Sequence, residues 1–194
     1  MDNYLIKKLQ KRNKELRIYQ ETDPLDPRRD YDNLGKMICF HKRYDLGDKT
    51  DLKSDNFAGW LWLKKYLIEE KNAKVILPLY LYDHSGITIS TNSFNCPWDS
   101  GQIGFIYMDK KTMKDNKLNN KKAEEILRNE VSVYDKYLTG QIYSFLLIKK
   151  VKCKCCGHIS EEVIDSCGNF LEFDDIFKEA GINNDVKTWK EVEV

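Results

Sequence analysis

Residues 75–82 read Val-Ile-Leu-Pro-Leu-Tyr-Leu-Tyr, a nearly continuous apolar run with the length of a β-strand. A run without polar alternation predicts a strand that is covered on both of its faces. Pro78 lies inside this run, and proline has no backbone N–H to donate to a neighbouring strand. The run therefore predicts a buried strand in which Pro78 occupies an edge position or a bulge.

Other elements are expected on both sides of this strand. Residues 87–90 alternate and form the return strand, and further apolar runs predict strands at 16–19, 37–41, 103–108, 142–148 and 163–164. Apolar residues at helical spacing predict helices over 57–68, capped by Ser54, and over 120–138, capped by Asn120 and followed by Gly140. A last helix is expected over 174–180 before Gly181, and the lysine-rich segment 110–122 is expected to be an exposed loop.

Strands that lie next to one another in sequence, with only two long helices, do not follow the βαβ alternation of a doubly wound fold. We therefore expect an α+β protein in which two main helices pack on one side of a single, mostly antiparallel sheet, with a short Cys-rich hairpin. Residues 1–194 are expected to form one domain, in which 1–14 is a basic arm and 150–168 is the hairpin.

Composition narrows the class of protein. The chain has 194 residues with 32 basic and 31 acidic side chains, so its net charge of +1 does not favour a nucleic-acid partner. No apolar run approaches the roughly 20 residues of a membrane span, and no signal peptide is recognisable. Reduced cysteines in a cytoplasm are therefore expected. The sequence has no P-loop, GxGxxG, GxSxG or HExxH motif, which disfavours the commonest nucleotide-binding, hydrolase and metalloprotease classes. The sequence does not indicate an oligomeric state.

The middle third of the chain concentrates groups that can carry chemistry. The catalytic candidates are an acid, imidazole and thiol set: His41, Asp83, His84, Cys96 and Asp99. Such groups can supply a nucleophile, a base and an orienting group, or they can ligate a metal. They can also be structural, because Asp two or three residues before Gly is typical of turns, here at 83–86, 99–101 and 165–168. The sequence predicts that the first two turns share one rim.

Four of the six cysteines lie between 153 and 167. The spacing Cys153-x-x-Cys156 is that of a zinc knuckle, and His158 and Cys167 complete a tetrahedral set for one structural Zn²⁺. In this interpretation Cys155 is surplus. A reduced hairpin without metal and a redox-active cysteine pair are the alternatives.

Basic residues beside aromatic ones form a third feature, at Lys42-Arg43-Tyr44 and Arg28-Arg29. They are of the type that contacts phosphate groups. However, several aspartates lie between them along the chain, so a solvated surface that neutralises itself is the favoured interpretation.

Several segments together resemble a family of small uncharacterised proteins common in bacteriophage and mobile-element genomes. The matching segments are 32–35 (DNLG), 39–48 (CFHKRYDLGD), 77–86 (LPLYLYDHSG), 96–107 (CPWDSGQIGFIY), 134–140 (YDKYLTG) and 164–168 (IDSCG). The resemblance runs from about residue 16 to about residue 170. It implies a phage or mobile-element origin and action in the host cytoplasm, and it implies no catalytic residue. The cysteines at 153–156 are an addition to the family pattern.

We therefore expect a phage accessory protein that binds and inhibits a host defence system, such as a CRISPR effector. Tyrosine, tryptophan and arginine contribute strongly to interfaces, so the binding residues are expected to include Arg43, Tyr44, Trp98 and Gln102. The alternative is a small enzyme that acts on a nucleotide or nucleic acid through the His/Cys/Asp pocket. A third alternative is a phage protein that forms homo-oligomers.

Overall fold

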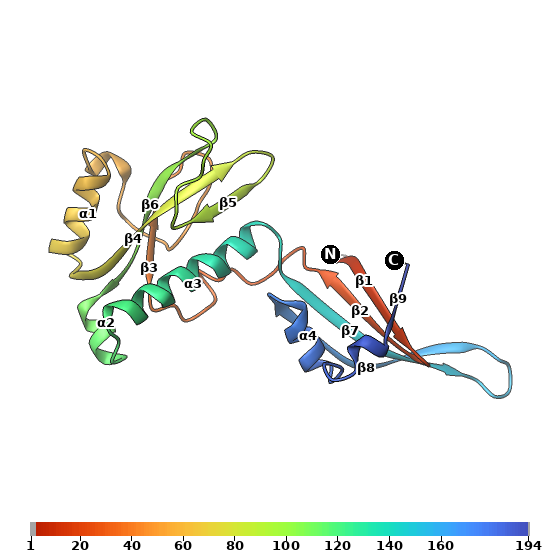
Figure 1. The fold of residues 1–194 in the computed structure, drawn as a ribbon. Coiled ribbons are helices and arrows are strands. Elements are labelled where there is room, and N and C mark those ends of the chain that lie inside the picture. Colours follow the sequence, from red (N-terminus) through yellow and green to blue (C-terminus); the bar gives the residue numbers. More distant parts are fainter. Residues whose placement is uncertain (1–2, 194) are drawn as a thin grey trace. The chain divides into compact units, whose positions relative to one another are not determined.

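The computed structural model describes residues 3–193 and divides the chain into two compact units (Figure 1). Unit 1 combines Met1–Leu25 with Gly140–Val194, and unit 2 is the continuous segment Asp26–Thr139. Each unit has its own sheet. The α+β class is confirmed, but the expected single sheet is wrong, because the strands form two antiparallel sheets.

The sheet of unit 2 is built around the apolar run that opened the sequence. Its order is β3 (Lys36–Cys39), β6 (Ser100–Asp109), β4 (Ala73–Asp83) and β5 (Ile87–Ser90). Strand β5 pairs with β4 only from Tyr80 onward, so Pro78 lies where β4 has β6 as its single neighbour. A register shift between Leu79 and Tyr80 follows at once. Pro78 therefore lies at an open edge of β4 and close to a bulge, and either feature accommodates a proline.

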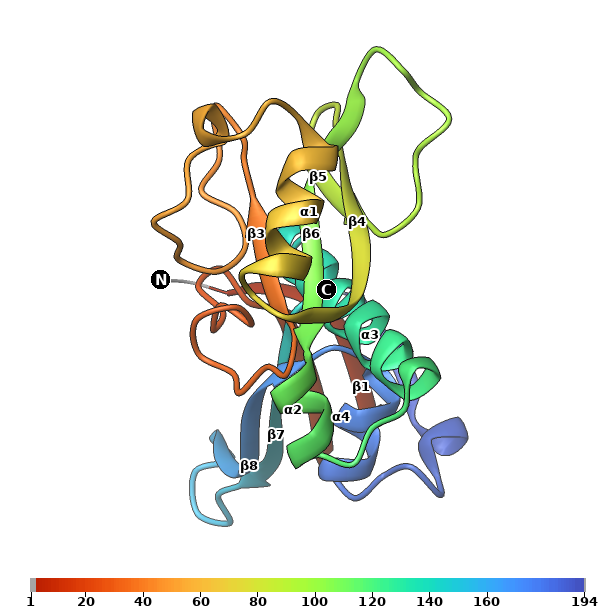
Figure 2. The ribbon, with the colours of Figure 1, turned by 90° about the vertical axis from the view of Figure 1, so that its left-hand side faces the viewer.

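Helices cover both faces of this sheet, which corrects the expectation that they pack on one side. Helix α3 (Asn120–Leu138) shares a core with residues such as Leu79 and Ile106, whereas α1 (Trp60–Glu69) packs on Phe105 and Tyr107. Neighbouring residues of a strand point to opposite faces, so Ile106 and Phe105 contact different helices. Figure 2 shows α1 lying across one face. Coverage on both faces explains why residues 75–82 lack polar alternation.

Three local expectations for unit 2 are also corrected. Ser54 begins the short 3₁₀ helix η1 (Ser54–Asn56), and Gly59 precedes α1 instead of a side-chain cap. The cap of α3 is Asn119, whose side chain accepts a hydrogen bond from the backbone N–H of Lys122. Part of the segment expected as a loop forms helix α2 (Lys110–Asp115), which begins because Asp109 accepts from the N–H of Thr112.

A buried ion cluster joins the loops of unit 2 to its sheet and to α3. The guanidinium of Arg28 is 1% exposed and donates to Asp48 at 2.8 and 2.9 Å and to Glu130 at 2.9 Å. Asp48 also accepts from the N–H of Met37, and Glu130 accepts from the N–H groups of Leu34 and Gly35. Arg28 is therefore not part of a solvated surface, although its charge is neutralised nearby as expected.

Unit 1 contains the second sheet, in the order β8 (Ile159–Phe170), β7 (Tyr143–Lys152), β2 (Lys14–Gln20), β1 (Tyr4–Lys11) and β9 (Lys190–Val192). Helix α4 (Phe173–Glu179) and the 3₁₀ helix η2 (Val186–Thr188) follow β8. One face of the sheet packs its apolar side chains against α4, and this core includes Leu16, Ile18, Phe145, Leu147, Ile176 and Trp189.

Two expectations for unit 1 are wrong. The basic arm at 1–14 is not an arm, since residues 4–11 form β1 and pair with β2 along nearly their whole length; residues 1–2 lie outside the described part of the chain. Asp165 and Gly168 are not in a turn either, because both lie within β8, where Asp165 pairs with Leu147 of β7. The strand predicted at 163–164 is thus the middle of a strand of 12 residues.

Unit 2 is inserted between two neighbouring strands of unit 1. Strands β2 and β7 are antiparallel neighbours, and Gln20 at the end of β2 pairs with Tyr143 at the start of β7. The N–H of Glu21 donates to the carbonyl of Ile142 at 2.9 Å, so the ladder continues beyond the two strands. The segment from 26 to 139 therefore occupies the place of a hairpin loop in the topology of unit 1.

Candidate functional site

The candidate site of unit 2 forms where β4 ends and β6 begins. Asp83 closes β4, and the turn after it is set by the positive φ of Ser85 and by a hydrogen bond from the N–H of His84 to the carbonyl of Gly86. The N–H of Asp83 donates to the carbonyl of Asp99 at 2.8 Å. This backbone bond brings the segments 83–86 and 96–102 together, although the long loop after β5 separates them in sequence.

Asp99 is the centre of the first group of side chains. Its Oδ2 lies 3.2 Å from Nδ1 of His84 and 3.7 Å from Sγ of Cys96, which donates to it. The loop is held at this point by Ser100, whose hydroxyl donates to the carbonyl of Cys96 at 2.5 Å. The spatial order is therefore thiol, carboxylate, imidazole, in which the carboxylate lies between the other two groups.

Asp83 is the centre of a second group, formed with the segment that leaves β3. Arg43 makes an ion pair with its carboxylate, and the hydroxyl of Tyr44 donates to the same carboxylate at 3.3 Å. The His41 ring stacks on that of Tyr44 with centroids 5.0 Å apart. The guanidinium of Arg43 also lies 5.4 Å from the centre of the Tyr44 ring. Arg43 is therefore oriented by a charge and by an aromatic face, while its side chain stays 67% exposed.

Both groups border one open pocket of about 570 Å³. Trp98 is 91% exposed, the most exposed of the large apolar residues in the described chain. Gln102 lines the pocket and donates to the carbonyl of Gly104. The pocket is lined by Phe40, His41, Lys42, Arg43, Leu81, Asp83, Trp98, Asp99, Ser100, Gly101, Gln102 and Ile103.

The structure thus brings all of the mid-chain candidates together. His41, Arg43, Asp83, Trp98, Asp99 and Gln102 line the pocket itself. His84, Cys96 and Tyr44 reach it through their contacts with Asp99 and Asp83. The expected gathering of these groups on one rim is confirmed, and what they do there stays a prediction. Ser100 also fixes the loop, although it is not among the residues that the sequence predicts for the site. The signal that could have found it is its position directly after Asp99.

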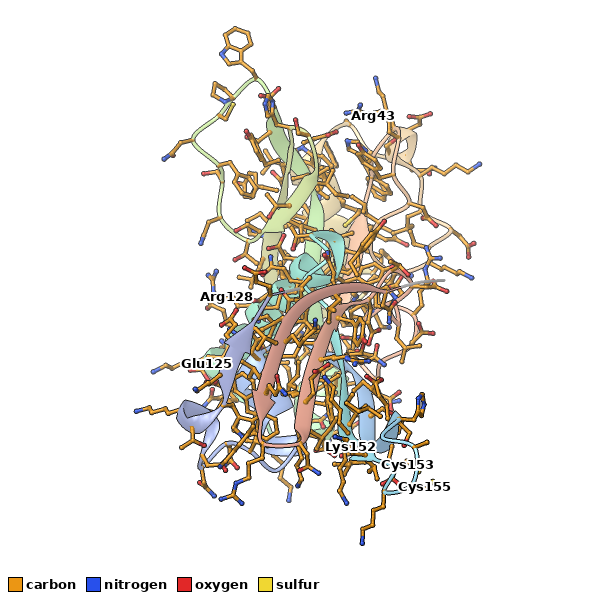
Figure 3. The ribbon with its side chains drawn as sticks, turned by 90° about the vertical axis from the view of Figure 1, so that its right-hand side faces the viewer. Arg43, Glu125, Arg128, Lys152, Cys153 and Cys155 are labelled. Atoms are coloured by element: carbon orange, nitrogen blue, oxygen red, sulfur yellow. The ribbon has the colours of Figure 1, made fainter. Side chains whose placement is uncertain are left out.

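The cysteine-rich segment lies in unit 1, as the six-residue loop 153–158 between β7 and β8 (Figure 3). Two backbone hydrogen bonds close the loop, from the N–H of Cys153 to the carbonyl of His158 and from the N–H of Gly157 to the carbonyl of Cys153. Gly157 has a φ of 74°, which glycine adopts without strain. The sulfur atoms of Cys153, Cys155 and Cys156 lie within 4.8 Å of one another.

These three cysteines could hold a metal ion, but they are not the expected set. Cys155 belongs to the cluster, and Cys167 does not. Lys152 pairs with Ile159 at the loop end of the hairpin, whereas Cys167 pairs with Phe145. Cys167 lies eight positions after Ile159 on β8, which is roughly 26 Å at about 3.3 Å per residue. Cys167 therefore cannot complete a site in the loop.

The thiols within the loop affect one another. The sulfur atoms of Cys153 and Cys155 are 2.9 Å apart. A hydrogen bond from the Cys155 thiol, with further bonds from the backbone N–H groups of Cys156 and Cys155, lowers the pKa of Cys153 to about 6. The same contact raises the pKa of Cys155, because that thiol is the donor. Cys39 is different: burial, followed by the charge of Asp48, raises its pKa to about 12.

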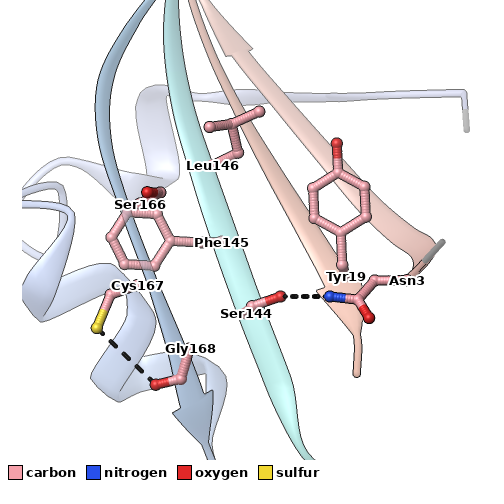
Figure 4. Close-up of a pocket in the computed structure, with 8 residues that line it drawn as sticks. All are labelled: Asn3, Tyr19, Ser144, Phe145, Leu146, Ser166, Cys167 and Gly168. Atoms are coloured by element: carbon pink, nitrogen blue, oxygen red, sulfur yellow. Dashed lines mark hydrogen bonds between the residues drawn. The ribbon is translucent and has the colours of Figure 1, made fainter. Parts of the chain in front are cut away.

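A further pocket of about 640 Å³ lies on the sheet of unit 1 (Figure 4). It is lined by Asn3, Tyr19, Ser144, Phe145, Leu146, Ser166, Cys167 and Gly168. Among these lining residues none carries a carboxylate, an imidazole or a basic group. The side chain of Asn3 donates to the hydroxyl of Ser144 at 3.5 Å, and the thiol of Cys167 donates to the carbonyl of its neighbour Gly168 at 3.8 Å. This pocket therefore offers little chemistry despite its volume.

Comparisons of this chain with protein-family models, with curated proteins and with solved structures yield no match. No helix in the described part of the chain is both long and apolar enough to cross a membrane.

Proposed function

We propose that this protein is a binding protein whose contact surface is the rim of the unit 2 pocket. We call the residues Arg43, Tyr44, Asp83, Trp98 and Gln102 the Trp98 surface. The observation that carries the proposal is the 91% exposure of Trp98 on a loop that is fixed at its base. Burial of a large aromatic side chain against a partner lowers the free energy of the complex. A loop that is already ordered loses little conformational entropy when a partner covers it.

The rest of the surface supports a protein partner. Arg43 and Tyr44 are of the residue types that dominate protein interfaces, and Asp83 already orients both of them. The charges that line the pocket balance one another, because Lys42 and Arg43 are basic whereas Asp83 and Asp99 are acidic. A polyanion such as nucleic acid would meet these carboxylates, which disfavours it as the partner.

The particular partner that we propose is a protein of a bacterial host, first of all a component of a defence system such as a CRISPR effector. This choice rests on the resemblance to phage and mobile-element proteins. The protein would then act in the host cytoplasm, as an inhibitor that occupies a surface of its target.

Catalysis receives less support from the same rim. A Cys/His pair needs the imidazole next to the thiol, so that it can take the proton. Here Asp99 lies between His84 and Cys96, so the imidazole is not next to the thiol. The side chain of His84 is 63% exposed, so water reaches it freely. A nucleotide-directed enzyme therefore stays the second choice.

The test is capture of a defence-system component and relief of that defence in infected cells. Trp98→Ala should weaken capture by about 30-fold, since loss of an interface tryptophan costs about 2 kcal/mol or more. Arg43→Ala should act in the same direction. Trp62→Ala is the matched control, because Trp62 is a 57% exposed tryptophan on α1 that is not in the pocket lining. If Trp98→Ala and Trp62→Ala behave alike, or if only further copies of this chain are captured, the proposal is wrong.

We also propose that the cysteine loop holds one structural Zn²⁺ through Cys153, Cys155 and Cys156. Zinc prefers four ligands of the thiolate and imidazole type. His158 is the remaining candidate in the loop, and its backbone carbonyl already accepts from the N–H of Cys153. The ion would fix the end of the β7–β8 hairpin.

Elemental analysis of protein purified without a metal-affinity tag tests this cofactor. Wild type and Cys167→Ser should both carry about one zinc per chain, whereas Cys155→Ser should lose most of it. Equal zinc in Cys155→Ser and Cys167→Ser would refute the ligand set, and wild-type protein without zinc would refute the cofactor.

A further inference from the structure

The cysteine loop has a second capacity, which concerns its thiols and not the metal. The sulfur atoms of Cys153 and Cys155 are 2.9 Å apart. Two residues at positions i and i+2 have Cα atoms close enough for a disulfide, so the bond needs no rearrangement of the strands. The loop also leaves these thiols accessible, since Cys155 and Cys156 are exposed and Cys153 is half-buried.

We propose that Cys153 and Cys155 are a modification site, at which a hydroperoxide converts the two thiols into a reversible disulfide. The proposal uses the same cysteines as the proposed zinc site. It describes how that site would be regulated, because a disulfide leaves neither sulfur as a thiolate ligand.

The chemistry balances in two steps. The sulfur of Cys153 attacks the O–O bond of the hydroperoxide, which breaks to give a sulfenic acid on Cys153 and an alcohol, or water when the oxidant is hydrogen peroxide. The sulfur of Cys155 then attacks the sulfur of Cys153, so that the S–S bond forms, the S–O bond breaks and water leaves with the proton of Cys155. The two thiols are oxidised, the peroxide is reduced, and an added dithiol reverses the change by exchange.

The position of the loop limits the effect to one end of unit 1. It follows the pair Lys152 and Ile159, and its two closing hydrogen bonds involve the backbone of Cys153. A ring through Cys153 and Cys155 changes the geometry of this loop, while the ladder from Lys152 back to Tyr143 stays paired. The change is therefore expected to act on metal binding and on the surface of the loop, and not on the stability of the sheet.

The other cysteines provide matched controls. Cys167 is also exposed, but it lies on β8 opposite Phe145 and has no thiol beside it. Cys39 is the last residue of β3 in unit 2, where it is half-buried against the core, so it lies outside the cysteine loop. Cys156 lies in the loop and tests whether Cys155 is the specific partner of Cys153.

The experiment treats chelator-stripped, full-length protein with hydrogen peroxide and follows its intact mass. Wild type, Cys156→Ser and Cys167→Ser should each lose about 2 Da, and the loss should reverse with a dithiol. Cys155→Ser should instead gain oxygen, without loss of hydrogen. Trypsin cleaves after Lys154, so a Cys153–Cys155 bond links two peptides that otherwise separate. If Cys155→Ser loses about 2 Da as fast as wild type, or if wild type only gains oxygen, the proposal is wrong.

A zinc-loaded arm separates this inference from the proposed cofactor. If both hold, bound zinc should slow disulfide formation roughly tenfold or more, and peroxide should release the metal. If zinc does not bind, stripped protein and protein incubated with zinc will form the disulfide at the same rate, and only the zinc proposal fails. If zinc binds but no disulfide forms in stripped protein, only this inference fails.

Discussion

Arg28 and Arg29 are neighbours in sequence with opposite environments. The side chain of Arg28 is 1% exposed and meets two carboxylates and the carbonyl of Gly35, whereas that of Arg29 is 39% exposed. A buried charge is tolerated only when its partners replace the lost water. Asp48 and Glu130 do so here, and both also accept backbone N–H groups of the segments around β3. The motifs at 32–35 and 46–48 therefore serve the fold of unit 2.

Substitution of Arg28 should be strongly destabilising. Arg28→Ala leaves the carboxylates of Asp48 and Glu130 without their cation, which should cost about 3 kcal/mol or more in the free energy of unfolding. Arg29→Ala removes the same side chain from an exposed site and should change it by less than about 0.5 kcal/mol. Chemical denaturation of both variants measures the difference. Similar midpoints for the two variants would show that the cluster does not stabilise unit 2.

Glu15 in unit 1 gives a dependence of stability on pH. This residue is 3% exposed and accepts from Lys150 and Arg17, each at 2.6 Å. Burial alone would raise its pKa, but hydrogen bonds from the two cations outweigh burial and lower the pKa below the ordinary 4.5. Its ionised form therefore stabilises unit 1 above about pH 4.5, and this contribution is lost as the pH falls through the lowered value.

Thermal unfolding of Glu15→Gln and wild type between pH 3 and 7 tests this sign. The variant should be the less stable protein at pH 7, and the gap should narrow below about pH 4.5. Glu162→Gln on the exposed strand β8 is the control. A gap that is constant with pH, or one that widens in acid, would contradict the assignment.

At the scale of elements, β3 and β6 approach each other closely because of one glycine. A Cβ on Gly104 would lie 1.8 Å from the carbonyl oxygen of Ile38 on the neighbouring strand. Pairing of Cys39 with Gly104 brings the segment 40–44 to the pocket rim. Gly104 thus positions His41 and Arg43, although it does not itself line the pocket.

Gly104→Ala should separate β3 from β6 and destabilise unit 2 by roughly 1–3 kcal/mol. Binding through the Trp98 surface should also weaken in this variant, because the segment 40–44 would shift away from the pocket rim. Gly101→Ala is the control on the same strand, because a Cβ at Gly101 meets no atom within 4 Å. Unfolding curves of the two variants should differ clearly, and a Gly104→Ala protein as stable as Gly101→Ala would show that the strands can adjust.

At the scale of the whole molecule, unit 2 is inserted between β2 and β7, and we expect each unit to fold independently of the other. Both hydrophobic cores of unit 2 and its ion cluster consist of residues from 26 to 139 alone. The sheet of unit 1 closes through the pair Gln20 and Tyr143. Each unit therefore has the contacts that its own fold requires.

Residues 26–139 expressed alone should unfold cooperatively and keep the Trp98 surface. Unit 1 with a short linker from 25 to 140 should fold as well, and it should keep the cysteine loop chemistry. Circular dichroism during heating and proton NMR spectra check both fragments. A segment 26–139 without a cooperative transition, while the full chain has one, would show that unit 2 depends on unit 1.

The sequence by itself determined most strands, the two long helices, the α+β class and the mid-chain groups of the candidate site, because these depend on local periodicity and on turn residues. The apolar run at 75–82 indicates a strand covered on both faces. The structure agrees with this signal and not with the expected packing of both helices on one side of the sheet. Only the tertiary structure decided that there are two sheets, that Arg28 is buried, that Asp99 separates His84 from Cys96, and that Cys155 replaces Cys167 in the cluster. The physical reason is that pairing register and burial depend on contacts between residues far apart in the chain, which spacing along the sequence does not specify.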